Sequence, residues 1–473
     1  MKIPPPPPKV KQKGDGNYFF TFVGKSFVHV ILISVLGLLV YSNTFHAPFQ
    51  WDEHTFIVDN PLIQDISYFL EPSKAEGFEY YSAFKSRYIG YLTFALNYRF
   101  HGTDVRGYHV FNITIHILNA MLVYFLVVLT FRTQFLSLRG TESRSNLIAL
   151  FSALLFVSHP IQTEAVTYIF QRFVPLSAFF CLLSMVFYIK WRLSPSPNPL
   201  PRGEGARGRV LPLLLYLTSL LSAVLAMKTK ENAFTLPIVI TLYEFLFFKG
   251  SLGKKILYLI PLLLTMLIIP LTLVGIDKPV GEIIEAVDSV AGIRAENWVY
   301  LYTEFRVIVT YIRLLFFPVN QNIYYDYPIY HSFLNLEVVL SFVFLLFIFA
   351  FAVYLIASSR RSDKRLIGFG ILWFFIALSV ESSIISLPMV INEYRLYLPS
   401  VGVLIAIASA ASLLVERLRH KKIRVPVFSF FGLIVLVLSL AGYARNEAIR
   451  HYLNALKLKP DYHDARKLLN EIK

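Results

Sequence analysis

The chain has 473 residues, of which 56% are hydrophobic and only 16% are charged. This composition is too apolar for an ordinary soluble protein and far from that of a disordered one, so it indicates a membrane protein. The net charge of +15 does not indicate nucleic-acid binding, because the basic residues lie mainly in short connections between apolar segments, as membrane topology requires.

Eleven apolar segments are predicted to be membrane-spanning helices. They lie at residues 27–43, 108–131, 147–158, 166–191, 211–227, 234–249, 255–276, 336–357, 366–384, 398–415 and 425–443. Several are shorter than the roughly 20 residues that cross a bilayer core, so we expect their ends to extend into polar flanks. The first segment follows a basic tail, residues 1–26, and no small-residue cleavage site follows it, so we interpret it as an uncleaved span.

The connections alternate in charge. The N-terminal tail and the short connections around Arg132, Lys190, Lys249, Arg360 and Arg417 are dense in Lys and Arg, which predicts a cytoplasmic position. The other connections are mixed in charge and mostly longer, and they contain nearly all the candidate functional residues: 44–107, 159–165, 228–233, 277–335, 385–397 and the C-terminal tail. The N-terminus is therefore expected inside and the C-terminus outside, on the periplasmic face.

Two segments do not fit a simple row of spans. Residues 298–317 are apolar but carry Glu304, Arg306 and Arg313, so we expect an amphipathic helix at the outer interface. Residues 444–473 place Ala448 and Tyr452 at helical spacing, in an order that resembles a tetratricopeptide repeat. That pattern predicts a short pair of helices at residues 444–473. We assign the membrane domain to residues 27–443.

The acidic pair Asp52-Glu53 follows the first span closely, in the outer connection 44–107. Carboxylates at or near a bilayer are costly and are functional candidates. A carboxylate beside an acceptor hydroxyl can act as a general base. A solvated acidic loop is the alternative interpretation of the pair taken alone.

Further polar residues stand at the outer ends of other spans and are predicted to converge with the acidic pair. Arginine and lysine there suit a donor that carries phosphate. The spacing of the histidines and acids matches no defined metal-ligand motif, so no cofactor is expected, with a divalent metal held by His109, His116, His159 or Glu164 as the less favoured alternative. The candidate substrate-binding residues are Arg87, His109, His159, Glu164, Arg172, Lys230, Glu231, Glu393 and Arg395.

Together these outer-face motifs resemble the transmembrane and tetratricopeptide-repeat O-mannosyltransferase-like proteins, which are membrane glycosyltransferases of the GT-C fold. The motifs occur in the family's order over about residues 28–445. They are Asp52-Glu53 with Asp59-Asn60-Pro61, Gly107-Tyr108-His109 with Asn112 and His116, His159-Pro160 with Thr163-Glu164-Ala165, Lys230-Glu231 with Leu236-Pro237, Phe317-Pro318, and residues 393–400 from Glu393 to Ser400.

The resemblance implies an all-α polytopic protein with a GT-C-type bundle of about eleven transmembrane helices in a bacterial inner membrane. It implies an inverting transfer of a sugar, possibly mannose in this family, from a polyprenyl-phosphate donor to a hydroxyl of a protein, glycan or lipid. Asp52 is then expected to be the catalytic base, with Glu53 as its positioning neighbour. A transporter or flippase for lipid-linked sugar and a non-enzymatic scaffold are the alternatives, and Asp52→Asn separates them from an enzyme.

Overall fold

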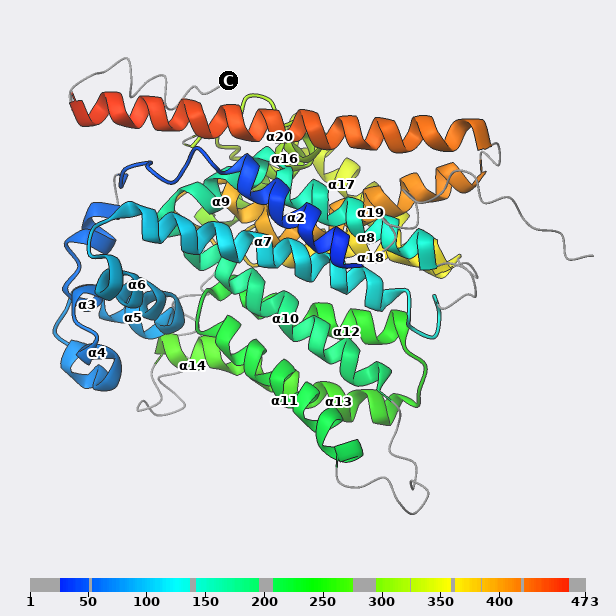
Figure 1. Cartoon of the computed structure of the whole chain (residues 1–473), viewed down its shortest axis with the longest axis horizontal. Coiled ribbons are helices and arrows are strands. Elements are labelled where there is room, and N and C mark those ends of the chain that lie inside the picture. Colours follow the sequence, from blue (N-terminus) through cyan, green and yellow to red (C-terminus); the bar gives the residue numbers. More distant parts are fainter. Residues whose placement is uncertain are drawn as a thin grey trace, which may run out of the picture.

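The computed structural model of the protein describes residues 26–50, 53–136, 142–194, 207–274, 295–323, 325–358, 362–383, 385–417 and 421–458. All regular secondary structure in these ranges is helical, which confirms the predicted all-α class. The longer helices run alongside one another across the molecule (Figure 1).

Each of the eleven predicted spans contains at least one helix. The longer helices are α2 (Ser26–Val40), α7 (Val105–Thr130), α8 (Glu142–Ser158), α10 (Phe173–Leu193), α11 (Arg207–Met227), α12 (Leu236–Phe247), α13 (Leu252–Leu264), α14 (Ile268–Val274), α16 (Ala295–Phe316), α17 (Leu336–Ala357), α18 (Ser362–Leu378), α19 (Tyr397–Arg417) and α20 (Lys421–Leu458).

The number of crossings is supported only in part. Within the described ranges, seven helices are long and apolar enough to cross a membrane, or eight if the pair Arg144–Ser158 and Pro160–Thr167, bent by 51°, counts as one span. Helix α2 has 15 residues and α12 has 12, so by length alone they fall short of the bilayer core. The structure thus supports the prediction of a multi-pass membrane protein, and the number of eleven crossings remains a prediction.

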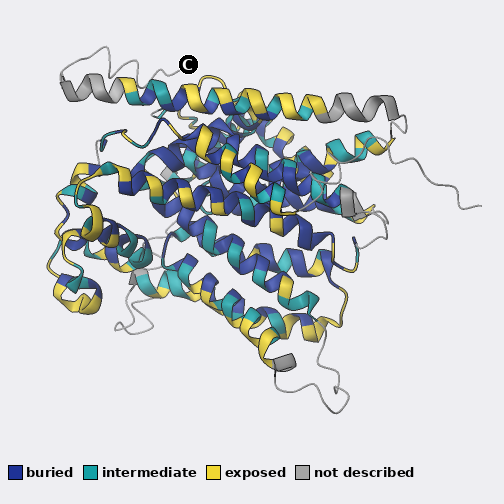
Figure 2. Ribbon diagram, in the orientation of Figure 1, coloured by how far each residue is buried: buried dark blue, intermediate teal, exposed yellow. Residues whose placement is uncertain are grey.

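The helices of the bundle differ in how far they are buried. Helices α7, α8, α10 and α19 form its buried centre, whereas α11, α13, α17 and α20 expose rows of large apolar side chains (Figure 2). Exposed Leu211, Phe347 and Leu440 are examples from three of these peripheral helices. In a membrane protein such surfaces face lipid, because the acyl chains solvate them as well as a protein core does.

Two glycines let α18 and α19 approach closely. A Cβ atom added at Gly370 would lie 2.3 Å from the carbonyl oxygen of Gly402. A Cβ atom added at Gly402 would likewise lie 2.3 Å from the carbonyl oxygen of Gly370. Small residues at facing positions allow this backbone contact in membrane bundles. The close packing matters for the site because α19 continues directly from residues 393–396.

The first outer connection is a compact helical unit with a core of its own. Its elements are η1 (His54–Val58), α3 (Pro61–Gln64), α4 (Ser67–Leu70), η2 (Pro72–Ala75), α5 (Tyr81–Ser86) and α6 (Tyr88–His101). Phe84 and Phe94 pack there with Tyr108 of α7 and Phe173 of α10. Asn60 accepts a hydrogen bond from the Leu62 amide and Pro61 occupies the first helical position, so this motif starts α3.

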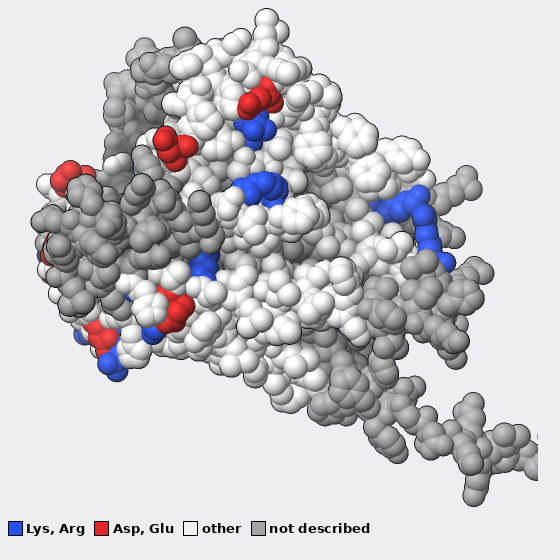
Figure 3. Space-filling view, turned by 90° about the horizontal axis from the view of Figure 1, so that it is seen from above, with Lys and Arg blue, Asp and Glu red and all other residues white. Residues whose placement is uncertain are grey.

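The two ends of the bundle differ. Helix α2 begins at the end opposite to α3–α6, and α20 ends on the same side as α3–α6 (Figure 1). The Asn43 side chain, just after α2, donates to the carbonyl of Tyr443 in α20 at 2.9 Å, so these two segments meet there. On the face shown in Figure 3 the acidic side chains, with several basic ones among them, lie toward the end that holds α3–α6, and the other end shows basic side chains. This arrangement agrees with an odd number of crossings.

The two unusual segments take more specific forms. Helix α16 covers the predicted amphipathic segment, and its buried face, which includes Val307 and Tyr311, packs in a cluster with Leu345 of α17 and Phe374 of α18. Helix α20 runs unbroken from Lys421 to Leu458, so the first part of the predicted repeat extends the last apolar helix. The remainder, residues 459–473, lies outside the described ranges.

Candidate active site

Segments that are far apart in the sequence meet at the end of the bundle that holds α3–α6. They are η3 (Pro160–Gln162), α9 (Thr163–Thr167), η4 (Ile169–Arg172), η5 (Glu231–Thr235) and η7 (Glu393–Leu396). The Ile89 amide of α6 donates to the carbonyl of Lys228 at 3.0 Å, which joins the first outer unit to the segment before η5. Because membrane spans return the chain to the same face, these short helices gather at one end.

Glu53 ties the acidic segment to η4. Its carboxylate is fully buried and accepts hydrogen bonds from the Gln50 amide at 2.7 Å and the Phe170 amide at 3.0 Å. A buried carboxylate needs such donors to offset its lost hydration. The arrangement suits the predicted positioning role of Glu53, whereas Asp52, the predicted base, lies outside the described residues.

Arg172 lies in a closed aromatic and polar cage. Its Nε donates to Asn112 Oδ1 at 2.7 Å, and its guanidinium carbon lies 4.3 Å from the centre of the Phe94 ring and 4.5 Å from that of Phe111. The side chain is fully buried. These contacts hold α6, α7 and the start of α10 together, so they point to a structural role for Arg172 instead of the predicted phosphate contact.

Arg87 and Glu231 form an ion pair at the surface of the site. Arg87 Nη2 lies 2.9 Å from Glu231 Oε2, and about a third of each side chain is exposed. Burial opposes ionisation of Glu231, but the Arg87 guanidinium outweighs it and holds the pKa of Glu231 below its usual value. The pair joins the start of α6 to η5.

Lys230 contacts two groups that lie on other segments. Its Nζ lies 2.8 Å from Glu381 Oε1 and 4.6 Å from the centre of the Tyr394 ring. Glu381 follows α18, and the motif analysis did not include it. The Lys230 ammonium is therefore held between a carboxylate and an aromatic face, which is a stable setting for a largely buried cation.

Arg395 is buried beside a second unpredicted acid. It donates to the carbonyl of Val390 at 2.9 Å, and its Nη1 lies 4.0 Å from Glu304 Oε1 of α16. Burial raises the pKa of Glu304 to about 7. The Tyr300 hydroxyl lies 3.4 Å from the same Nη1 and donates to the carbonyl of Glu381, so the Lys230 and Arg395 clusters are neighbours.

Arg445 of α20 binds the buried acid at the start of η7. Its Nη1 lies 2.8 Å from Glu393 Oε2 and donates to the carbonyl of Pro160 at 3.0 Å. Glu164 of α9 accepts the Tyr394 amide at 3.0 Å, so both predicted acids support η7. One arginine from the last helix thus connects η3 to η7.

His109 and His159 bind backbone atoms. His109 Nε2 lies 2.9 Å from the carbonyl of Ala47. His159 Nδ1 accepts the Ile161 amide at 3.1 Å, which leaves its Nε2 to donate to the carbonyl of Leu315 at 3.1 Å. Both histidines are buried, and these bonds give them structural roles. The described part of the chain holds no group of three or more His, Cys, Asp or Glu arranged to hold a metal.

The structure therefore brings together Arg87, Glu164, Lys230, Glu231, Glu393 and Arg395, and it sets Arg172, His109 and His159 in packing positions. The motif analysis missed Glu304, Glu381 and Arg445. Each of these three residues is a charged residue in or beside an apolar helix. That feature of the sequence marks a residue as a candidate for a functional site or for a buried ion pair.

Comparison with known proteins supports the family resemblance. No family model matches the chain. Protein O-mannosyl-transferase tmtc2 of Xenopus laevis is 34% identical over 165 residues, which is 34% of this chain and 18% of that protein. Protein O-mannosyl-transferase TMTC3 of Homo sapiens is 24% identical over 453 residues, which is 88% of this chain and 46% of that protein.

A solved structure shows a more distant similarity. ArnT from Cupriavidus metallidurans bound to undecaprenyl phosphate aligns with 92% of this chain and 72% of its own, at 12% identity and a TM-score of 0.37. The chain spans less than half the length of the two O-mannosyl-transferases above. The chain is similar to these protein O-mannosyl-transferases, which confirms the resemblance predicted from the outer-face motifs.

The Arg445–Glu393 pair is predicted to be a major stabilising contact. Breaking a buried ion pair from one side leaves an uncompensated charge and costs about 3–5 kcal/mol. Arg445→Gln should therefore lower the melting temperature of the detergent-solubilised protein markedly, and adding Glu393→Gln should recover part of the loss. Arg450→Gln is the matched control, because Arg450 pairs with Glu447 on the same helix with 30% of its side chain exposed. Equal stability of Arg445→Gln and Arg450→Gln would contradict this assignment.

The Arg87–Glu231 pair should make stability depend on pH in the acid range. The pKa of Glu231 is lowered in the folded protein from 4.5, so its contribution is fully present above about pH 4.5 and is lost as the pH falls through the lower folded value. The melting temperature of Glu231→Gln should lie below that of the wild type near neutral pH and approach it only below about pH 4.5. If the two curves already coincide at about pH 6, the pair does not hold the carboxylate ionised.

Proposed function

We propose that the chain is a GT-C-type membrane glycosyltransferase that transfers a sugar from a polyprenyl-phosphate donor to a hydroxyl acceptor. The observation that carries the proposal is the convergence of cations and acids at the end that holds α3–α6, from four segments that are far apart in the sequence: Arg87, Glu164, Lys230–Glu231 and Glu393–Arg395. The names of the relatives, protein O-mannosyl-transferases, support mannose as the sugar and a protein as the acceptor.

The reaction requires a base and a place for the leaving phosphate. In this proposal Asp52 removes the proton from the acceptor hydroxyl as that oxygen attacks the anomeric carbon of the sugar. The bond from the anomeric carbon to the phosphate oxygen breaks, and the polyprenyl phosphate departs from the opposite face, which inverts the configuration. A phosphate leaves readily without a proton, so electrostatic stabilisation completes the step.

Arg87 and Lys230 are the cations best placed to receive the phosphate. Arg87 reaches Glu231 from the start of α6, Lys230 directly precedes Glu231 in the chain, and both cations favour the ionised form of Glu231. Arg87 is the more exposed of the two and offers a planar fork that matches phosphate geometry. Arg395 would act one layer deeper, by holding η7 and Tyr394 in place beneath Lys230.

The proposed location is a bacterial inner membrane with this site on the periplasmic face. The basic connections at the opposite end support that orientation, because positively charged connections remain in the cytoplasm. The polyprenyl tail then stays in lipid while its phosphate meets the cations at the interface. In the proposal the N-terminus is cytoplasmic and the C-terminus is periplasmic.

Asp52→Asn tests the proposed chemistry. Membranes that contain the variant should transfer label from polyprenyl-phosphate mannose to protein about 10²–10⁴-fold more slowly than the wild type, because a positioned base is lost. Asp65→Asn is the matched control, since Asp65 lies exposed in the same connection and outside the outer-face motifs, and it should leave the rate unchanged. Glu53→Gln should lose less than Asp52→Asn. Transfer by Asp52→Asn at the control rate would remove Asp52 from the catalytic role.

A further inference from the structure

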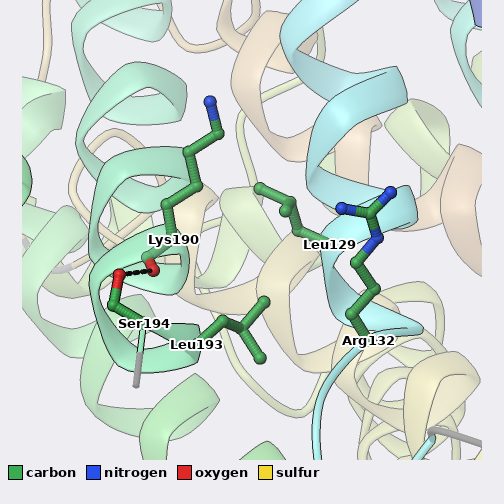
Figure 4. A pocket seen from close by; sticks show the side chains of 5 residues that line it. All are labelled: Leu129, Arg132, Lys190, Leu193 and Ser194. Carbon is green, nitrogen blue, oxygen red and sulfur yellow. Dashed lines mark hydrogen bonds between the residues drawn. The ribbon is translucent and has the colours of Figure 1, made fainter. Parts of the chain in front are cut away.

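An open cavity of about 380 Å³ lies at the end of the bundle opposite to the candidate active site. It lies between the ends of α7 and α10 and is lined by Leu129, Arg132, Lys190, Leu193 and Ser194 (Figure 4). Neither the motifs of the sequence nor the proposed reaction uses these residues.

Two cations face this cavity from different helices. Arg132 follows the end of α7 and Lys190 lies in the last turn of α10, so the two basic residues line the cavity from two different helices (Figure 4). Both side chains are exposed, and none of the five described residues that line the cavity is acidic. The described part of the wall therefore gives the cavity a positive charge.

Two acids near this end, Glu244 and Glu416, already have partners. Glu244 is bound by Arg192 at 2.8 Å and is fully buried. Glu416 is bound by Arg144 at 2.9 Å. Arginine and lysine side chains both bind phosphate groups, so Arg132 and Lys190, which line one cavity, together form a setting for an anionic ligand.

The position of the cavity indicates the kind of anion. The two apolar spans that flank it end at Thr130 and Leu193, which places Arg132 and Lys190 at the depth of lipid headgroups. Leu129 and Leu193 supply apolar wall beside the cations. A free solute ion would use only the charges, whereas a lipid would use both the charges and the apolar wall.

We propose that this cavity binds the phosphate of an anionic phospholipid headgroup from the adjacent leaflet, with Arg132 and Lys190 as its ligands. Each such basic residue at a membrane surface adds roughly 1 kcal/mol of attraction, equivalent to about a fivefold change in affinity. The site is separate from the proposed catalytic end, so it stands or falls independently of the transfer reaction.

Lipid titration followed by native mass spectrometry tests the proposal. The detergent-solubilised full chain should bind phosphatidylglycerol more tightly than phosphatidylcholine, and Arg132→Gln with Lys190→Gln should weaken phosphatidylglycerol binding by about 20–30-fold. Lys254→Gln is the matched control, because Lys254 is an exposed cation near the same end but does not line the cavity. The melting temperature of each variant reports whether it is folded.

Two results would overturn the proposal. The first is a double variant that is folded and binds phosphatidylglycerol as tightly as Lys254→Gln does, which would leave the two cations with only the role of stabilising the ends of α7 and α10. The second is full displacement of the lipid by inorganic phosphate at millimolar concentration, which would identify a site for free phosphate.

Discussion

One turn of α20, residues 443–447, holds the candidate active site together. Arg445 binds Glu393 and the carbonyl of Pro160, and Asn446 donates to the carbonyl of Val40 and accepts the Thr167 hydroxyl. These bonds connect the end of the first helix, the segment at residues 160–167 and η7 through one part of the last helix. Buried charges must be paired to be tolerated in an apolar bundle, so this turn fixes the positions of segments that are up to about 400 residues apart.

The same constraint explains the character of the other polar residues at this end. Lys230 requires Glu381, Arg395 requires backbone carbonyls and Glu304, and Glu53 requires two amides, because each is buried away from water. Such a network keeps the outer segments in one arrangement. Preorganised charge at the place where a phosphate departs is also what a transferase of lipid-linked sugar needs.

Much of this could be predicted from the sequence because it depends on local pattern. Apolar length located the helices, and the outer-face motifs contain Lys230 and Tyr394, whose side chains are in contact. The partners could not be predicted in the same way. Arg172 carries the same kind of charge as Arg395, but the rings of Phe94 and Phe111 enclose it, and only the packing of α6 against α7 decides that. The unbroken course of α20 through Pro426, Gly432 and Gly442 likewise could not be predicted from local pattern, because the helix is supported by its contacts with α2 and α8.

The central claim is that sugar transfer takes place at the end of the bundle that holds α3–α6, on the outer face of the membrane. The most direct measurement compares right-side-out and inverted membrane vesicles that carry labelled polyprenyl-phosphate mannose in both leaflets and meet a membrane-impermeant hydroxyl acceptor from outside. The account predicts that right-side-out vesicles label the acceptor and that sealed inverted vesicles label it only after permeabilisation. Labelling by sealed inverted vesicles alone would contradict the account, because it would place the reaction at the basic end.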